Sequence, residues 1–181
     1  MKKLVLFLFL ISSVFATQSG SYMGFGIGYG SLKVDDTLNK NRDSDGIVGS
    51  FALGHTYGEY GRIYVVGMYR GGSHGYENAG SVSLAYDFLV PVVDDNTLSV
   101  YLGPVAGYTG YNSNGLDLSG AHYGLEGGFI YTIDDDSEIE MGVRGLREKG
   151  SEDAFTAERS LTGYVQVNFY FDSKKYLKYN N

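Results

Sequence analysis

The sequence predicts an all-β protein, built as an eight-stranded antiparallel up-and-down transmembrane β-barrel. Three observations predict this class. First, the 181 residues include 27 Gly, 17 Tyr and 10 Phe, and Gly costs about 1 kcal/mol relative to Ala at each position inside a helix. Second, the chain begins with the pattern of an export signal. Third, the remainder divides into eight segments in which apolar residues alternate with small or polar ones, as in strands that cross a membrane in about 9–11 residues.

Residues 1–16 are expected to be a signal peptide. Lys2 and Lys3 precede an apolar run over residues 4–11, and Val14 and Ala16 fit a cleavage site. The run is shorter than the about 20 residues that a membrane helix needs. Cleavage leaves 12 basic and 21 acidic residues, a net charge of −9, so we expect no nucleic-acid partner. Without Cys, the chain has no disulfide, thiolate zinc site or lipid anchor.

The first four segments cover residues 22–32, 46–57, 61–70 and 79–90. Their apolar faces carry, in order, Met23, Phe25 and Ile27; Ile47, Phe51 and Leu53; Ile63 and Val65; and Val82, Leu84 and Phe88. The opposite face is glycine in the first segment, small in the second, and large or charged in the third. Small residues facing large ones are expected to fill a narrow barrel without clashes.

The last four segments cover residues 98–110, 119–133, 138–146 and 160–171. Their apolar faces carry Leu98, Val100 and Leu102; Tyr123, Leu125 and Phe129; Ile139, Met141 and Val143; and Leu161, Val165 and Phe169. Pro104 interrupts the fifth segment and has no N–H to donate, so we expect a bulge or kink there. An even number of strands closes the sheet without a free edge, as lipid requires.

Seven charged residues lie inside these segments, all on the face opposite the apolar one: Arg62, Arg70, Asp87, Glu126, Glu138, Glu140 and Arg144. A charge that faces lipid near the midplane costs about 2–4 kcal/mol, and side chains fill the lumen of an eight-stranded barrel. We therefore predict a structural polar cluster in the lumen, in which the four acids neutralise the three arginines. A gated ion path is the alternative.

The connections between segments alternate in length. Those over residues 33–45, 71–78, 111–118 and 147–159 are longer than those over 58–60, 91–97 and 134–137. This alternation is typical of a barrel with one end outside the cell and the other in the periplasm. The four longer connections are predicted to be extracellular loops, and the tail 172–181 is predicted to be periplasmic.

Other candidate sites point to no enzyme, cofactor or metal. His122 has Ser119 nearby in sequence, and Glu126, on the same face, lies about 13 Å away at 3.3 Å per residue, so no catalytic set forms. His55 is expected at the membrane interface, and His74 in a loop. Acids at 94–95 and 134–136 are expected to be turn residues. Asp35, Asp36, Asp43 and Asp45 lack the pattern of an EF-hand.

Three stretches carry a resemblance to a known class: residues 22–30 (YMGFGIGYG), 100–108 (VYLGPVAGY) and 163–171 (GYVQVNFYF). The mature chain, residues 17–171, resembles the small outer-membrane β-barrels of Gram-negative bacteria, the opacity-protein and OmpA-like class. The resemblance implies the outer membrane as location, with outer-membrane lipid, lipopolysaccharide and the barrel-assembly machinery as partners. The class usually ends on the aromatic residue of its last strand, whereas residues 172–181 continue here.

The function predicted from these features is a structural or surface-interaction role, adhesion-like, through extracellular loops whose ligand the sequence does not identify. A narrow low-conductance channel and a lipid-A-modifying enzyme are the alternatives. A soluble periplasmic β-sandwich is the alternative architecture, because a soluble sheet also sorts charges to one face.

Overall fold

The strands are all antiparallel and follow one another around the barrel in chain order. The computed structural model describes residues 19–36, 42–58, 60–72, 78–93, 97–113, 116–149, 151–152 and 155–171. The strands are β1 (Ser19–Asp36), β2 (Arg42–Tyr57), β3 (Gly61–Gly72), β4 (Asn78–Pro91), β5 (Leu98–Ser113), β6 (Leu116–Asp134), β7 (Ser137–Glu148), β8 (Ser151–Glu152) and β9 (Phe155–Tyr170).

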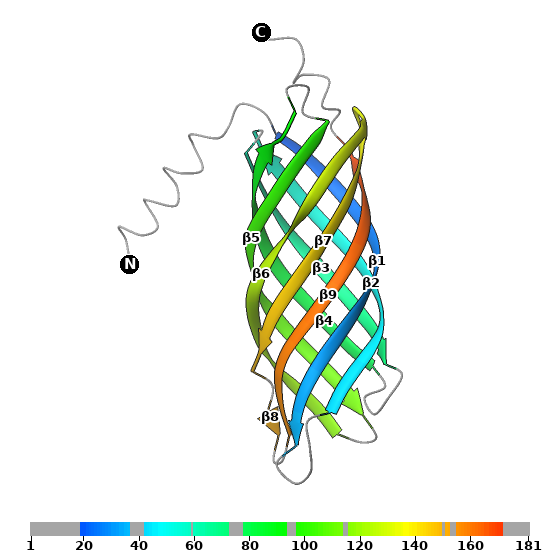
Figure 1. Ribbon diagram of the computed structural model, residues 1–181, viewed down its shortest axis with the longest axis vertical. Coiled ribbons are helices and arrows are strands. Elements are labelled where there is room, and N and C mark those ends of the chain that lie inside the picture. Colours follow the sequence, from blue (N-terminus) through cyan, green and yellow to red (C-terminus); the bar gives the residue numbers. More distant parts are fainter. Residues whose placement is uncertain are drawn as a thin grey trace, which may run out of the picture.

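Closure of the barrel comes from the pairing of the first long strand with the last. Tyr22 lies opposite Tyr170, and the β1–β9 ladder continues to Asp36 and Phe155. Each of β1 to β7 also pairs with its neighbour, β7 pairs with β9, and β8 adds only a short hairpin to β9. The start of β1 and the end of β9 lie at the end of the barrel opposite β8 (Figure 1). The predicted eight-stranded up-and-down barrel is confirmed.

Side chains alternate between the outer surface and the lumen as the period of two predicts. Outward Ile27 and Leu161 are 65% and 55% exposed, whereas inward Ala52 and Tyr64 are buried. Small residues make room for large ones inside. A Cβ on Gly54 would lie 2.4 Å from the Tyr22 ring.

The strands continue past their predicted ends on the side where β8 lies. β1 continues to Asp36, β5 to Ser113 and β7 to Glu148. Much of the predicted loops 33–45, 111–118 and 147–159 is therefore strand. The sequence misleads here because the outward positions of these extensions are polar, as at Lys33 and Arg147, so the apolar face that marks a lipid-facing strand is missing.

The connections at the opposite end are tight turns. Gly58 has a φ of 61° after β2, in the left-handed region that Gly adopts readily. After β6, the amide of Asp136 and the hydroxyl of Ser137 donate to Asp134 Oδ1 at 3.0 and 2.7 Å. These hydrogen bonds hold the pKa of Asp134 below its ordinary value, and they confirm the predicted turn role of this acid.

The sequence predicts a bulge or a kink at Pro104, and the strand register there contains no bulge. Pairing between β4 and β5 stops at Ala85–Val105 and resumes at Phe88–Leu102 in the same register. Pro104 therefore interrupts hydrogen bonding without adding a residue, since it lacks an N–H. Register shifts occur instead between Lys33 and Val34, opposite β9, and between Thr132 and Asp134, opposite β7.

Several predicted features lie outside the described residues: the signal peptide 1–16, the tail 172–181, His74 and Asp94–Asp95. Among the described residues, no helix is long and apolar enough to cross a membrane.

Candidate functional site

Arg62, on β3, holds two carboxylates in the middle of the lumen. Its Nε donates to Asp87 Oδ2 at 2.8 Å and its Nη1 to Glu140 Oε2 at 2.8 Å. All three side chains are essentially inaccessible to solvent. The guanidinium carbon also lies 5.1 and 4.8 Å from the ring centroids of Tyr64 and Tyr101, a favourable cation–π geometry. Arg62 thus joins β3 to β4 and, across the lumen, to β7.

Arg144, on β7, makes the second buried ion pair. Its Nε and Nη2 donate to Glu126 Oε2 on β6 at 2.7 and 2.5 Å. The other carboxylate oxygen of Glu126 accepts from the Tyr64 hydroxyl, and Arg144 Nη1 lies 2.9 Å from Met68 Sδ. Both charges are therefore paired and additionally hydrogen-bonded, which a buried ion pair requires.

Tyrosine hydroxyls connect the two ion pairs into one network. Tyr164 donates to Glu140 Oε1 at 2.8 Å and lies 3.3 Å from Glu126 Oε2. Tyr101 shares a hydrogen bond of 2.7 Å with Tyr164. The network spans five strands, β3 to β7, and reaches β9 through Tyr164, so the middle of the lumen is crossed by side chains from most of the barrel wall.

All seven charged residues predicted for the lumen lie on its inner face, but they do not form a single cluster. Arg62, Asp87, Glu126, Glu140 and Arg144 make up the network just described. Glu138 lies nearer the end where β9 stops and accepts from Tyr170 at 2.7 Å. Arg70 lies toward the β8 end, with Nη2 3.3 Å from the Thr162 hydroxyl, apart from the acids proposed to neutralise it.

A second polar cluster, which sequence reasoning missed, surrounds His122. Its Nε2 lies 2.8 Å from Ser83 Oγ, and its Nδ1 lies 2.7 Å from Thr109 Oγ1. Thr109 donates to Glu148 Oε2 at 3.2 Å, and Ser160 donates to Glu148 Oε1 at 2.9 Å. Because the Thr109 proton goes to Glu148, His122 donates from Nδ1 to the Thr109 hydroxyl oxygen.

The predicted neighbour of His122, Ser119, is not its partner. Three residues along a strand place two side chains on opposite faces, and Ser119 instead accepts a hydrogen bond of 2.9 Å from outward-facing Tyr108. Glu148 was missed because the seventh segment was predicted to end at residue 146. One more period of two beyond Leu146, continuing the inward series that contains Glu140 and Arg144, would have placed Glu148 in the lumen.

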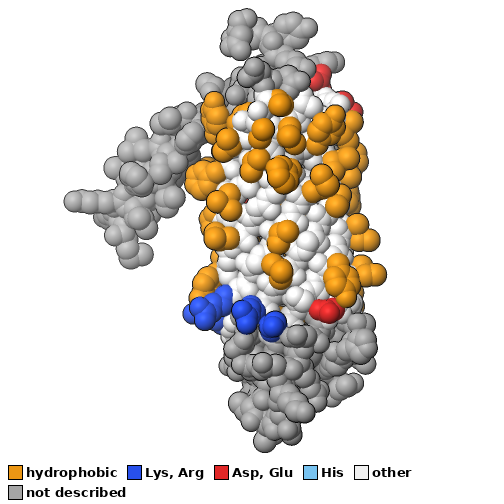
Figure 2. Space-filling view, viewed as in Figure 1, with side chains coloured by type: hydrophobic (Ala, Val, Ile, Leu, Met, Phe, Trp, Pro, Cys, Tyr) orange, Lys and Arg blue, Asp and Glu red, His pale blue; other side chains and the backbone are white. Residues whose placement is uncertain are grey.

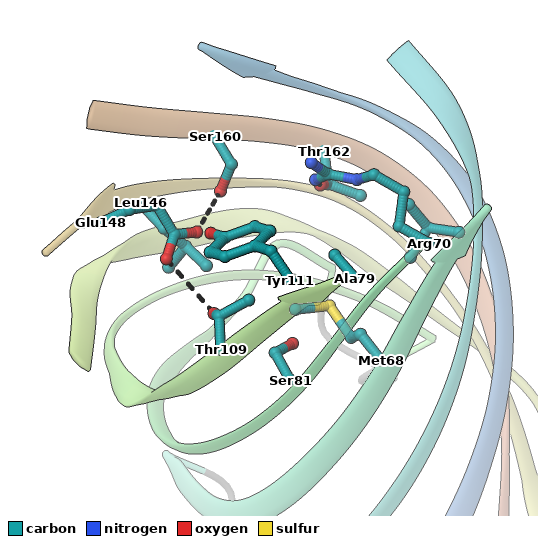
Figure 3. Close-up of a pocket in the computed structure, with 11 residues that line it drawn as sticks. Met68, Arg70, Ala79, Ser81, Thr109, Tyr111, Leu146, Glu148, Ser160 and Thr162 are labelled. Atoms are coloured by element: carbon teal, nitrogen blue, oxygen red, sulfur yellow. Dashed lines mark hydrogen bonds between the residues drawn. The ribbon is translucent and has the colours of Figure 1, made fainter. Parts of the chain in front are cut away.

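A small cavity opens beside this second cluster, toward the β8 end of the lumen (Figure 3). Its volume is about 20 Å³, enough for about one water molecule. Arg70, Tyr111, Glu148 and Thr162 line it, whereas Ser83 and His122 do not. The Ser83–His122–Glu148 arrangement resembles the hydroxyl, imidazole and carboxylate of a hydrolase, but Ser83 is 1% exposed and the cavity does not reach it.

No group of acids and histidines suited to a metal ion occurs among the described residues. The chemistry that these lumen side chains do support is mutual neutralisation and hydrogen bonding across the barrel.

Comparison with known proteins identifies the fold. No protein family matches the sequence, and no curated protein sequence does either. Among solved structures, the chain is similar to the Neisserial surface protein A, NspA, with a TM-score of 0.65 and 13% identity over 82% of this chain and 97% of that one. It is also similar to outer membrane protein H, OprH, from P. aeruginosa, with a TM-score of 0.54 and 20% identity over 84% and 99%.

The chain has the fold of the small eight-stranded outer-membrane barrels. At these identities, the likeness concerns the fold and not the activity.

Proposed function

We propose that the chain is an integral outer-membrane protein, anchored by a barrel with a closed lumen, that presents the hairpins at its β8 end to the cell exterior for a structural or adhesion-like role. The observation that carries this proposal is the inverted distribution of side chains. Large apolar residues cover the outside of the barrel, while Arg62, Glu126, Glu140 and Arg144 are buried within it. A soluble β-sandwich would bury those apolar residues.

The height of the apolar surface supports membrane insertion. Along β9 and the residue after it, the outward apolar residues run from Leu161 to Phe171, a span of ten residue steps that rises about 25 Å at 3.3 Å per residue and a strand tilt of about 40°. On β6, they run from Tyr123 to Ile133, again ten residue steps. An apolar band about 25 Å tall is what outer-membrane barrels present to lipid.

Orientation follows from the two ends of the barrel. The turns at the end where β1 starts and β9 stops are short, and outer-membrane barrels place their short turns in the periplasm. The strand extensions of β1, β5 and β7 then project from the outer leaflet. We place the surface-interaction role on these hairpins.

The filled lumen argues against the channel alternative. Ion pairs and tyrosines join opposite walls at mid-height, and the cavity beside Glu148 holds about one water. We assign both polar clusters a packing role. For the enzyme alternative, mass spectrometry of lipid A from cells with and without the protein is expected to show the same species, because Ser83 and His122 face the lumen and not the lipid.

Epitope tags test the location and the orientation together. One tag is inserted in the connection 73–77, between β3 and β4, and a matched tag in the connection 94–96, between β4 and β5. In intact cells we expect antibody to reach the first tag only, and both after the outer membrane is permeabilised. The untagged protein should migrate differently on gels when heated. Recovery in the soluble periplasmic fraction would refute the proposal.

A further inference from the structure

Basic side chains gather at one edge of the apolar surface, on neighbouring strands (Figure 2). Arg159 on β9 lies directly opposite Lys33 on β1 and, on its other side, opposite Arg147 on β7. Lys149 lies two residues beyond Arg147. All four side chains are exposed. We call these residues, Lys33, Arg147, Lys149 and Arg159, the basic row.

Such a row opposes strand pairing unless an anion covers it. Residues directly opposite each other on antiparallel strands have Cβ atoms about 4.5–5.5 Å apart, and like charges there are destabilising. Asp43 lies opposite Lys33 on β2, which leaves the repulsion between Arg147 and Arg159, with Lys149 nearby. Beyond Arg147, the next strand offers Tyr123, and the Lys149 ammonium lies 5.4 Å from that ring.

The height of the row matches the headgroup region of a bilayer. On β9, Leu161 is the outward apolar residue nearest the β8 end, and Arg159 is the next outward residue toward that end. Tyr123, beside Arg147, ends the apolar series of β6. The guanidinium groups therefore lie where the phosphates of an outer-leaflet lipid would be, and Arg binds phosphate with two parallel hydrogen bonds.

Below the row, the outer surface has room for acyl chains. Gly145 lies two residues from Arg147 on β7, and Gly163 lies four residues from Arg159 on β9. A Cβ on Gly163 would meet no atom within 4 Å, and one on Gly145 would meet only a Leu161 methyl group, at 3.9 Å. The outer surface therefore carries no side chain at Gly145, directly below Arg147, or at Gly163, which lies below Leu161 on the strand of Arg159.

We propose that Arg147, Arg159 and Lys149 bind the phosphate groups of a phosphorylated outer-leaflet glycolipid of the lipopolysaccharide class, with its acyl chains against Gly145 and Gly163. This inference rests on the proposed location and orientation of the barrel, because only the outer leaflet brings that lipid to this end.

The test measures lipid A binding to the full mature chain, refolded in zwitterionic detergent. The variant R147Q/R159Q is compared with wild type and with K174Q/K175Q, a control that loses the same two charges in the segment 172–181. Each basic group near an anionic surface contributes about 1 kcal/mol to binding. Removing two should therefore raise the dissociation constant about 25-fold, since 1.4 kcal/mol corresponds to a factor of ten. We expect that loss in R147Q/R159Q and wild-type affinity in the control.

Further measurements identify the ligand. Lipid A stripped of its phosphates should bind wild type as weakly as intact lipid A binds R147Q/R159Q, and millimolar inorganic phosphate should not compete. Without lipid A, R147Q/R159Q should unfold at the same or a higher urea concentration than wild type, because like-charge repulsion is gone.

Equal lipid A affinity of wild type and R147Q/R159Q would overturn the proposal, as would phosphate-independent binding. Heparin, a soluble polyanion, serves as a second probe. If R147Q/R159Q lost heparin binding but kept wild-type affinity for lipid A, the proposal would also be overturned, in favour of a soluble polyanion as the ligand. A wild-type protein that lacks heat-modifiable migration would refute the proposed function instead.

Discussion

Neutralising one member of the Arg144–Glu126 pair should destabilise the barrel more than neutralising both. Glu126→Gln keeps the shape of the side chain and an acceptor for Tyr64, but it leaves the Arg144 cation buried opposite an amide. Arg144→Met keeps a flexible apolar stem beside Met68, but it leaves the Glu126 carboxylate without its cation. The double variant E126Q/R144M contains neither charge.

The expected magnitudes follow from the burial of the pair. The side chains of Arg144 and Glu126 are 4% and 0% exposed, with a closest contact of 2.5 Å. Removing one partner of such a pair typically costs about 3–5 kcal/mol, whereas replacing both with packed neutral side chains is often close to neutral. We therefore expect each single variant to lose about 3–5 kcal/mol and the double variant to lose less than either.

Urea unfolding of the barrel in phospholipid vesicles measures these differences. The chain has no Trp, so the folded fraction is best quantified from the heat-modifiable gel band. If the double variant lost as much free energy as the two single losses added together, the two side chains would not act as a pair, and the proposed packing role of the network would be wrong.

Three further predictions concern the lumen and the outer surface. Gly142→Ala should lower the free energy of unfolding by about 1–3 kcal/mol, a typical cost of overpacking, because its Cβ would lie 1.9 Å from the Tyr101 hydroxyl. Gly163→Ala, with open space around it, should stay within about 0.5 kcal/mol of wild type. Equal losses for the two variants in urea unfolding would contradict this prediction. Val165→Lys, near mid-height on the lipid face, should lower the free energy of unfolding by about 2–4 kcal/mol, and Leu161→Lys, beside Arg159, by about 0–1 kcal/mol. Equal losses at the two heights would argue against a bilayer around β9. In planar bilayers, wild type and Glu140→Gln should both show no conductance steps, with Glu140→Gln less stable; a stable, conducting Glu140→Gln would favour the ion path.

The membrane makes much of this fold readable from the sequence. Lipid outside and a filled lumen inside require alternation along every crossing, so both the strand count and the inward face of Arg62 or Glu140 follow from the sequence. Beyond the apolar band, this requirement ends. The extension of β7 to Glu148 was missed for that reason, and the His122 cluster with it.

Contacts across the lumen could not be predicted in the same way. Arg62 and Glu140 are 78 residues apart in the chain, and their meeting depends on the stagger between all the strands that separate them. Pro104 shows a similar limit. A missing N–H predicts a lost hydrogen bond, but whether the chain adds a residue there depends on the register of the neighbouring strands.

Closure between β1 and β9 has a consequence for how the protein is made. β1 has one of its two neighbours, β2, early in synthesis, but the other is the last strand to leave the ribosome. Until then, one edge of β1 is a row of open amides and carbonyls that can pair with another chain, and lipid cannot accept it. Assembly must therefore wait for the whole chain, and we expect a chain that stops before residue 155 to aggregate or be degraded rather than insert as an incomplete barrel.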